Sequence, residues 1–292
     1  EECSDSDYIL GVEIVSTPLN IFNYDEIRSK LDKLIAVLIS EGEKEKSYRS
    51  GIHIHIDATY FDLRFLKNAL ILGLASEPVF FYVGSFGYIN RAVKNDFTYC
   101  RSLHNPPIVS LGDKYIPVCE PLEMLKVKTI SGFFKYMGVD VKDPIRYHPA
   151  RYFWLNLYST ILHGTLEFRV FNKTFNTDFI MSAIELCKKF VEACIREDEI
   201  QIELNSIYNH NKSLTLDLYR RLNERYLFID EPYNSIIEKL ITISPQIKVL
   251  KEPIKTHLRR YELTYPQSYK PKEIYVEPKN PNFIDIHNLR GE

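Results

Sequence analysis

The sequence predicts an α+β fold: a curved, mainly antiparallel sheet with helices on one side, followed by an extended C-terminal tail. Three segments alternate apolar and polar residues as half-buried strands do, at residues 8–15, 51–57 and 164–171. Apolar residues at helical spacing follow each of these segments. Because each strand has one uniformly apolar face, we expect the helices to pack on that face.

The segment 51–57, Gly-Ile-His-Ile-His-Ile-Asp, carries the strongest chemical signal. Its three isoleucines lie on one face of the predicted strand, and His53, His55 and Asp57 lie on the other. A buried face does not normally carry three titratable groups. The pattern therefore predicts a cleft that holds a metal, an anion or both, and the alternative is an outer sheet face with two solvated histidines.

Two further strands divide their residues in the same way. In the segment 164–171, Gly-Thr-Leu-Glu-Phe-Arg-Val-Phe, Glu167 and Arg169 lie opposite an apolar face of Leu, Phe and Val. In the segment 8–15, Tyr-Ile-Leu-Gly-Val-Glu-Ile-Val, Glu13 lies on the polar face. The three polar faces would meet if the strands belong to one sheet.

Such a meeting would combine two kinds of chemistry. Glu13, His53 and Glu167 would form a hard-cation site of the Mg²⁺ or Mn²⁺ kind. His55 and Arg169 would supply positive charge for phosphate or carboxylate groups. We therefore expect the side chains of Glu13, His53 and Glu167 to converge.

At these strands the chain resembles a family, the amidoligases of the glutamine synthetase-like carboxylate–amine ligase superfamily. Residues 51–57 look like the G-x-H-x-H strand of these proteins, and residues 164–169 resemble their G-T-x-E-F-R strand. Residues 11–19 look like their G-V-E-x-x-S-P-x-L segment. Order and spacing agree over roughly residues 5–195, and the ordered set is more specific than H-x-H alone.

Two weaker matches add arginines to the predicted site. Residues 91–101 are similar to an arginine-bearing segment that ends in Tyr-Cys, and residues 151–157 are similar to R-Y-x-x-x-N-L. The resemblance implies that residues here hold the substrate carboxylate or the nucleotide. These residues are Arg91, Arg101, Arg151 and Asn156.

The resemblance also implies an activity. Such enzymes activate a carboxylate with ATP and then let an amine displace phosphate from the acyl-phosphate. ATP and Mg²⁺ or Mn²⁺ are the implied cofactors, with Glu13, His53 and Glu167 as metal ligands. His55 and Arg169 would face the nucleotide phosphates and the acyl-phosphate, because phosphoryl transfer depends on cations placed at the developing charge.

One departure from the family pattern leaves alternatives open. The family opens with an earlier strand, G-x-E-x-E, whose glutamates complete the metal cluster, and no such strand precedes Glu13. We expect either that an N-terminal piece is missing or that the protein is a degenerate member without metals. The second case predicts a structural or assembly protein, for instance in a virus or other mobile element. A metal-dependent hydrolase that uses His53 and His55 is a third, less favoured interpretation.

The composition limits which binding partners and which cellular compartment we expect for this protein. The net charge of −2 predicts no general attraction to nucleic acid or to anionic membranes. No apolar run approaches the roughly 20 residues that a membrane span needs. The five cysteines lack C-x-x-C spacing, and Cys187 and Cys194 share a helical stripe. This usage favours reduced core thiols in a cytoplasmic protein.

Capping residues and apolar residues at helical spacing predict where the helices lie. Candidate caps and first residues are Asn23 or Asp25, Asp62, and Thr177 or Asp178. Prolines are predicted to break residues 77–145 into short pieces, as in a long insertion that overlies a cleft. A later short helix is predicted to bury the stripe Leu214, Leu218 and Leu222. His148 and His163 lack ligand spacing, which favours structural roles.

We expect three regions along the chain: an amidoligase-like domain over residues 1–200, a helical extension over 201–252 and a Pro/Tyr-rich tail over 253–292. The tail can hardly fold alone, because proline removes hydrogen-bond donors and few of its apolar residues are in register. Its aromatic content favours docking on a second copy or a larger assembly. The alternative is a flexible leash.

Overall fold

The structure is a computed structural model. The chain forms two compact units, Glu1–Glu43 and Lys44–Glu292. The residues that the structure describes are 13–45, 50–87, 100–103, 108–111, 114–117, 121–144, 148–202 and 212–245. The described part of the first unit contains helix α1 (Tyr24–Ser40). Asn23 caps this helix, as predicted, by accepting a hydrogen bond from the backbone N–H of Glu26 at 3.2 Å.

The second unit mixes strands and helices, which confirms the predicted α+β class. Its strands are β1 (Gly51–Asp57), β2 (Ile108–Leu111), β3 (Lys114–Pro117), β4 (Leu155–Asn156) and β5 (Thr165–Asn172). Its α-helices are α2 (Leu63–Gly84), α3 (Ile130–Lys135), α4 (Ser159–His163), α5 (Thr177–Arg196), α6 (Lys212–Leu222) and α7 (Tyr233–Ile243). Short 3₁₀ helices span η2 (Pro121–Lys126) and η3 (Pro149–Tyr152), and a π-helical turn, η5, spans Asn223–Leu227.

The main sheet has the order β1-β5-β4, and both pairings are antiparallel, as predicted. Strand β5 therefore lies in the centre. The register places His55 opposite Glu167 and Asn156 on the other side of Glu167. The β1–β5 ladder is irregular between Ile52 and Ile54, so His53 sits at a bulge. A separate two-stranded sheet pairs β2 with β3.

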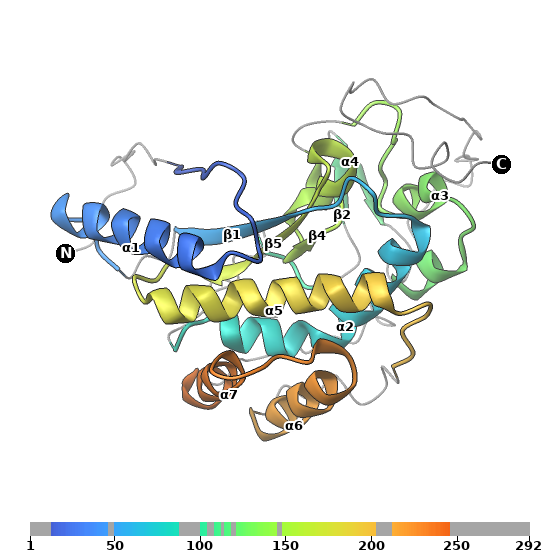
Figure 1. Ribbon diagram of the computed structural model, residues 1–292. Coiled ribbons are helices and arrows are strands. Elements are labelled where there is room, and N and C mark those ends of the chain that lie inside the picture. Colours follow the sequence, from blue (N-terminus) through green and yellow to red (C-terminus); the bar gives the residue numbers. More distant parts are fainter. Residues whose placement is uncertain are drawn as a thin grey trace. The chain divides into compact units, whose positions relative to one another are not determined.

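Helices α2 and α5 pack beneath the main sheet, and α6 and α7 lie below them (Figure 1). Aromatic rings join the layers. The ring centroid of Phe80 in α2 lies 5.6 Å from that of Phe168 in β5, and Phe190 in α5 lies 5.5 Å from Phe168. These contacts use the apolar face of β5, which confirms that the helices cover that side.

Helix α2 is buried along most of its length. Asp62 caps it as predicted, accepting from the N–H of Phe65 at 2.8 Å. Helix α2 extends through Pro78 to Gly84 inside the core, so the region from residue 77 onward begins with helix rather than with the short pieces expected there. By length and composition alone, α2 could also span a membrane, contrary to the sequence-based expectation. However, 89% of its apolar window is buried in the fold, and a core helix passes the same test.

Helices α6 and α7 share one core with α2 and α5. The stripe predicted for α6 was partly wrong: Leu214 is 48% exposed, and the buried face consists of Thr215, Tyr219 and Leu222. The hydroxyl of Tyr219 donates to Asn234 at 2.8 Å, so the helix turns its tyrosine toward α7. The described cysteines Cys100, Cys187 and Cys194 are buried thiols that form no disulfide with one another, as expected for core thiols.

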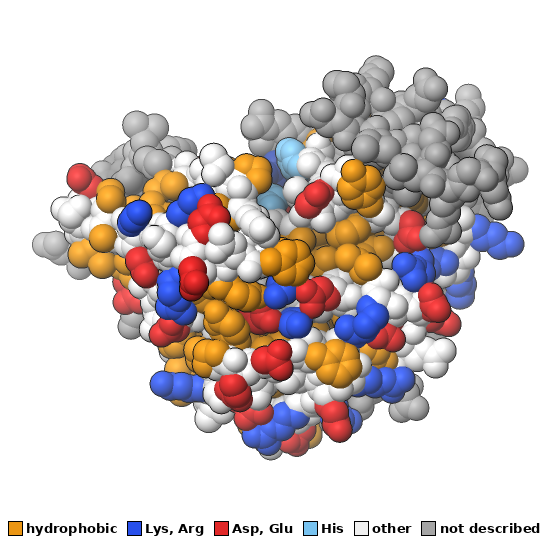
Figure 2. Space-filling view, viewed as in Figure 1, with side chains coloured by type: hydrophobic (Ala, Val, Ile, Leu, Met, Phe, Trp, Pro, Cys, Tyr) orange, Lys and Arg blue, Asp and Glu red, His pale blue; other side chains and the backbone are white. Residues whose placement is uncertain are grey.

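Acidic and basic side chains are interspersed on the face shown in Figure 2. They do not gather into a large patch of one sign there. This distribution agrees with the net charge of −2.

We predict that Gly84→Ala destabilises the protein because α2 approaches the β5 backbone at this point. An alanine Cβ at Gly84 would lie 2.8 Å from the carbonyl oxygen of Val170. The central strand cannot retreat without disturbing its pairing, so urea denaturation should show a loss of about 1–3 kcal/mol in the free energy of unfolding.

Gly73→Ala is the matched control for this prediction. Its Cβ would also meet atoms at 2.8 Å, but these are the side-chain ends of Leu103 and Leu155, which can shift. A similar loss in both variants would contradict the role assigned to the backbone of Val170.

Candidate active site

The polar face of β1 carries the predicted histidines. Burial alternates along the strand, with the isoleucines packed against the core and the other residues exposed. The side chains of His53 and His55 are 29% and 41% exposed. The predicted division of the strand into an apolar and a polar face is therefore confirmed, and both imidazoles remain accessible.

The opposing strand β5 begins immediately after a left-handed glycine. Gly164 has φ +68°, and its N–H donates to the carbonyl of Ser159, which ends α4. From this turn β5 starts at Thr165, and Glu167 and Arg169 follow on the polar face. These two side chains are only 5% and 8% exposed, although they share that face with the accessible histidines.

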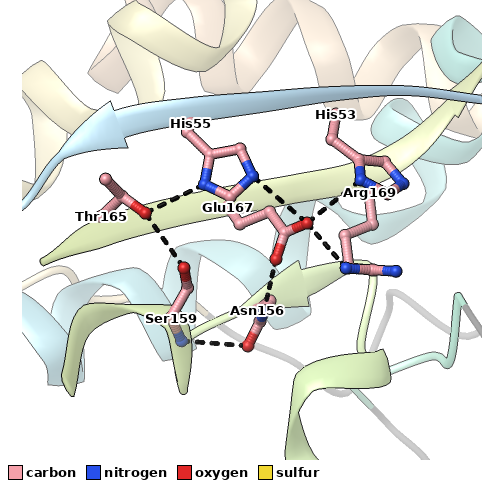
Figure 3. A network of polar contacts seen from close by, with 7 residues as sticks. All are labelled: His53, His55, Asn156, Ser159, Thr165, Glu167 and Arg169. Carbon is pink, nitrogen blue, oxygen red and sulfur yellow. Dashed lines mark hydrogen bonds and ion pairs between the residues drawn. The ribbon is translucent and has the colours of Figure 1, made fainter. Parts of the chain in front are cut away.

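Glu167 is the centre of the site (Figure 3). Its Oε1 lies 2.7 Å from Nη1 of Arg169, 3.3 Å from Nδ1 of His53 and 3.4 Å from Nε2 of His55. Its Oε2 accepts a hydrogen bond from Nδ2 of Asn156 at 2.5 Å. Both carboxylate oxygens thus have partners, which come from the three strands of the main sheet.

These partners determine the charge of Glu167. Burial raises the pKa of this carboxyl, but the hydrogen bond from His55 and the charges of Arg169, His55 and His53 outweigh burial and hold its pKa at about 2. Glu167 is therefore an anion at any physiological pH.

A second set of contacts closes a ring around the site (Figure 3). Nδ1 of His55 is hydrogen-bonded to the hydroxyl of Thr165 at 2.9 Å, and that hydroxyl lies 3.0 Å from Oγ of Ser159. The backbone N–H of Ser159 donates to Oδ1 of Asn156 at 3.1 Å. The N–H can only donate, so it fixes the amide of Asn156 with its Nδ2 toward Glu167.

The sequence analysis gave no role to Thr165 and missed Ser159. Strand alternation could have drawn attention to Thr165. Ser159 comes from α4, and no pattern in the sequence links that short helix to the histidine strand.

Arginines gather beside Tyr152 at one end of this network. The ring centroid of Tyr152 lies 5.6 Å from Cζ of Arg151 and 5.9 Å from Cζ of Arg169. Burial lowers the pKa of the Arg101 guanidinium, and electrostatic interaction with Tyr152 opposes this shift. The backbone N–H of Arg101 donates to the carbonyl of Tyr152 at 2.7 Å. Arg91 lies outside the described residues.

Glu13 belongs to the first unit, so its predicted convergence with His53 and Glu167 stays a prediction. The predicted strand over residues 8–15 is described only from Glu13 onward, and that part has no strand. Glu13 is exposed there, and the neighbouring Ile14 and Val15 are 54% and 79% exposed.

The described residues fit a hard cation only in part. No group of three His, Cys, Asp or Glu side chains among them is arranged to hold a metal ion. The network offers one carboxylate, Glu167, and imidazoles, which suit Mg²⁺ less well than oxygen ligands do. Further oxygen ligands would have to come from Glu13 or from residues outside the described ranges.

The remaining candidates have structural contacts. Oδ1 of Asp57 accepts from the N–H of Thr59 at 3.0 Å and from its hydroxyl at 2.5 Å. His148 is buried, caps η3 through the N–H of Ala150 and contacts the carbonyl of Gly138. Burial lowers the pKa of His148, so this imidazole is favoured in its neutral form.

Comparison with known proteins identifies the family. A family model described as "putative amidoligase enzyme" matches residues 1–191. The match covers more than half of the 292 residues, and the chain therefore belongs to the amidoligase family. This result confirms the resemblance inferred from the strand motifs and indicates a ligase. Neither the curated proteins nor the solved structures contain a significant match.

We predict that Glu167 makes stability depend on pH in the acid range. Its pKa falls from an ordinary 4.5 to about 2 in the folded protein. The unfolded chain therefore binds the proton more readily, and the contribution is complete above pH 4.5 and lost as the pH falls toward 2. The shift corresponds to roughly 3 kcal/mol at most.

Glu167→Gln should remove this part of the pH dependence, as measured by urea denaturation from pH 5 down to pH 2.5. At neutral pH the variant should also be less stable, because Arg169 stays buried without its counter-charge. Glu238→Gln is the control: it removes a more exposed partner of an arginine, Arg220, and should change little. An unaltered acid slope in Glu167→Gln would disprove the assignment.

Proposed function

We propose that this protein is an ATP- and Mg²⁺-dependent ligase that joins the carboxylate of an amino acid or peptide to an amine through an acyl-phosphate. Membership of the amidoligase family supports the ligase class. The observation that carries the finer proposal is the Glu167 network, in which a buried carboxylate and a buried guanidinium meet two accessible imidazoles on one face of a sheet.

The described residues divide into two groups under this proposal. Arg169 and His55, with Arg151 and Arg101 beside Tyr152, would hold phosphate or carboxylate oxygens. Arg169 suits this task because burial and its contact with Glu167 fix the direction of its planar fork. Further positive charge from Arg91 is implied by the family resemblance.

The family resemblance assigns Glu13, His53 and Glu167 to a divalent cation, whose chemistry would be to neutralise charge on the phosphates. For Glu13 the assignment rests on the resemblance alone. Asn156 is 2% exposed, and both ends of its amide are engaged. Its contribution to nucleotide binding would therefore act through Glu167.

A non-catalytic amidoligase with an assembly role is the second candidate. The contact that favours it is the 2.7 Å ion pair between Arg169 and Glu167, because the guanidinium already neutralises the oxygen that a cation would use. In this case the Pro/Tyr-rich tail would bind a second copy or a larger assembly. Residues 246–292 lie outside the described ranges, so this part of the proposal rests on the sequence.

A trapping assay separates the two candidates. Hydroxylamine replaces the amine and converts an activated carboxylate into a hydroxamate, which can be measured with ATP, MgCl₂ and a panel of amino acids. Arg169→Lys should lower hydroxamate formation roughly 100-fold, because lysine lacks the bidentate fork. Arg220→Lys alters another arginine that pairs with a glutamate and should remain near wild type. Undiminished turnover in Arg169→Lys would contradict the role of this side chain.

The cation dependence has its own test. ATP binding, measured by calorimetry, should require a divalent cation and vanish with EDTA. His53→Ala should weaken this binding at least tenfold at fixed MgCl₂, while the thermal transition stays cooperative, because His53 is 29% exposed. His163→Ala removes an exposed histidine outside the network and serves as the control. ATP binding that is indifferent to both EDTA and His53→Ala would reject the metal assignment.

A further inference from the structure

The core helix α2 contains one carboxylate that neither the family resemblance nor the network explains. Glu77 is 2% exposed in a helix whose neighbours are largely apolar. It accepts hydrogen bonds from the hydroxyl of Ser102, from the N–H of Leu103 at 2.8 Å and from Nε1 of Trp154 at 2.9 Å. A buried carboxylate costs several kcal/mol unless such donors compensate it.

These donors lie on two chain segments that pair with each other. The N–H of Arg101 donates to the carbonyl of Tyr152 at 2.7 Å, and the N–H of Trp154 donates to the carbonyl of Arg101 at 2.9 Å. Glu77 thus holds the residues that follow Arg101 and, through Trp154, the segment against which Arg101 is paired.

The same pairing leads directly to the active site. The carbonyl of Trp154 accepts from the N–H of Arg169 at 2.7 Å. Arg101 is therefore separated from the β5 backbone by one segment, or roughly 10 Å at ordinary strand spacing. The backbone of Arg101 is bonded to that of Tyr152, and the ring centroid of Tyr152 lies 5.9 Å from Cζ of Arg169.

We propose that Glu77 is a positioning residue for substrate binding: it fixes the backbone that carries Arg101, so that the Arg101 side chain starts from a fixed point, one segment away from Arg169 in β5, to bind an anionic group of the substrate. The inference rests on the proposed function, since that function gives Arg101 a carboxylate or phosphate to bind. Positioning from the core reduces the entropy that an arginine on a loose segment would lose on binding.

Two substitutions at Glu77 separate positioning from simple packing. Glu77→Met fills a similar volume but offers no acceptor to Ser102, Leu103 or Trp154. Glu77→Gln keeps one carbonyl oxygen for the two N–H donors, and its amide can donate to the Ser102 hydroxyl. We therefore expect Glu77→Gln to retain the geometry and Glu77→Met to release it.

The first measurement needs no turnover. In Glu77→Met, amide hydrogen exchange at Arg101 and Leu103 should be at least tenfold faster, while amides of the β1–β5 ladder stay unchanged. Trp154 is the only tryptophan of the sequence, so the tryptophan fluorescence reports on the surroundings of this one side chain, which include Glu77. In Glu77→Gln both signals should stay near wild type. If Glu77→Met does not fold, Ser102→Ala removes one donor and should accelerate the same amides to a smaller extent.

The second measurement is a double-mutant cycle with Arg101→Ala, using KM for ATP and for the acid in the hydroxamate assay. Glu77→Met should raise one of these KM values about tenfold with a smaller change in kcat, and it should have no further effect in the Arg101→Ala background. Additive effects on KM, or unchanged exchange in Glu77→Met, would overturn the inference while leaving the proposed function intact. A wild-type protein without ATP-dependent turnover would overturn the proposed function, and with it a role of Glu77 in substrate binding.

Discussion

The site depends on one buried anion, the carboxylate of Glu167. Arg169, Asn156 and two histidines, drawn from all three strands of the main sheet, converge on its two oxygens. Removing an ionised carboxylate from water is costly, and the protein compensates with a full guanidinium charge and an amide donor. The same compensation locks the relative register of β1, β5 and β4, so the chemistry of the site and the geometry of the sheet have a common cause.

A second buried carboxylate gives the core a polar anchor behind this site. Glu77 lies within α2, and its donors belong to segments that carry Arg101 and Trp154. An apolar helix alone would pack against these segments without choosing one register, since dispersion contacts are weakly directional. Hydrogen bonds to a fixed carboxylate select one arrangement. Glu77 bonds to Trp154 and Glu167 bonds to Asn156, so the two carboxylates hold the same short stretch of chain.

The parts of this arrangement that follow from the two-residue period of a β-strand were predictable. Alternation along residues 51–57 and 164–171 was enough to place His53, His55, Glu167 and Arg169 on one polar face, because each assignment needs only the parity of a residue. The ring of hydrogen bonds that includes Ser159 was not predictable, because it depends on how the left-handed turn at Gly164 places α4 beside β5. The stripe assigned to α6 failed for a related reason: a buried tyrosine that bonds to α7 outweighed the leucine spacing. Glu77 gave no signal either, since a glutamate in an apolar helix reveals nothing of its donors.

The Arg169–Glu167 contact also distinguishes the two proposed functions on energetic grounds. A divalent cation at the Glu167 oxygen would approach a guanidinium that already lies 2.7 Å from that oxygen. At 4 Å and an effective dielectric constant of about 20, such a pair repels by roughly 8 kcal/mol. Phosphate oxygens between the two cations would convert this repulsion into attraction, because each oxygen pairs with both charges. Under the ligase proposal this site would therefore take a cation and a polyphosphate together rather than either ligand alone, whereas under the scaffold proposal the ion pair itself would suffice.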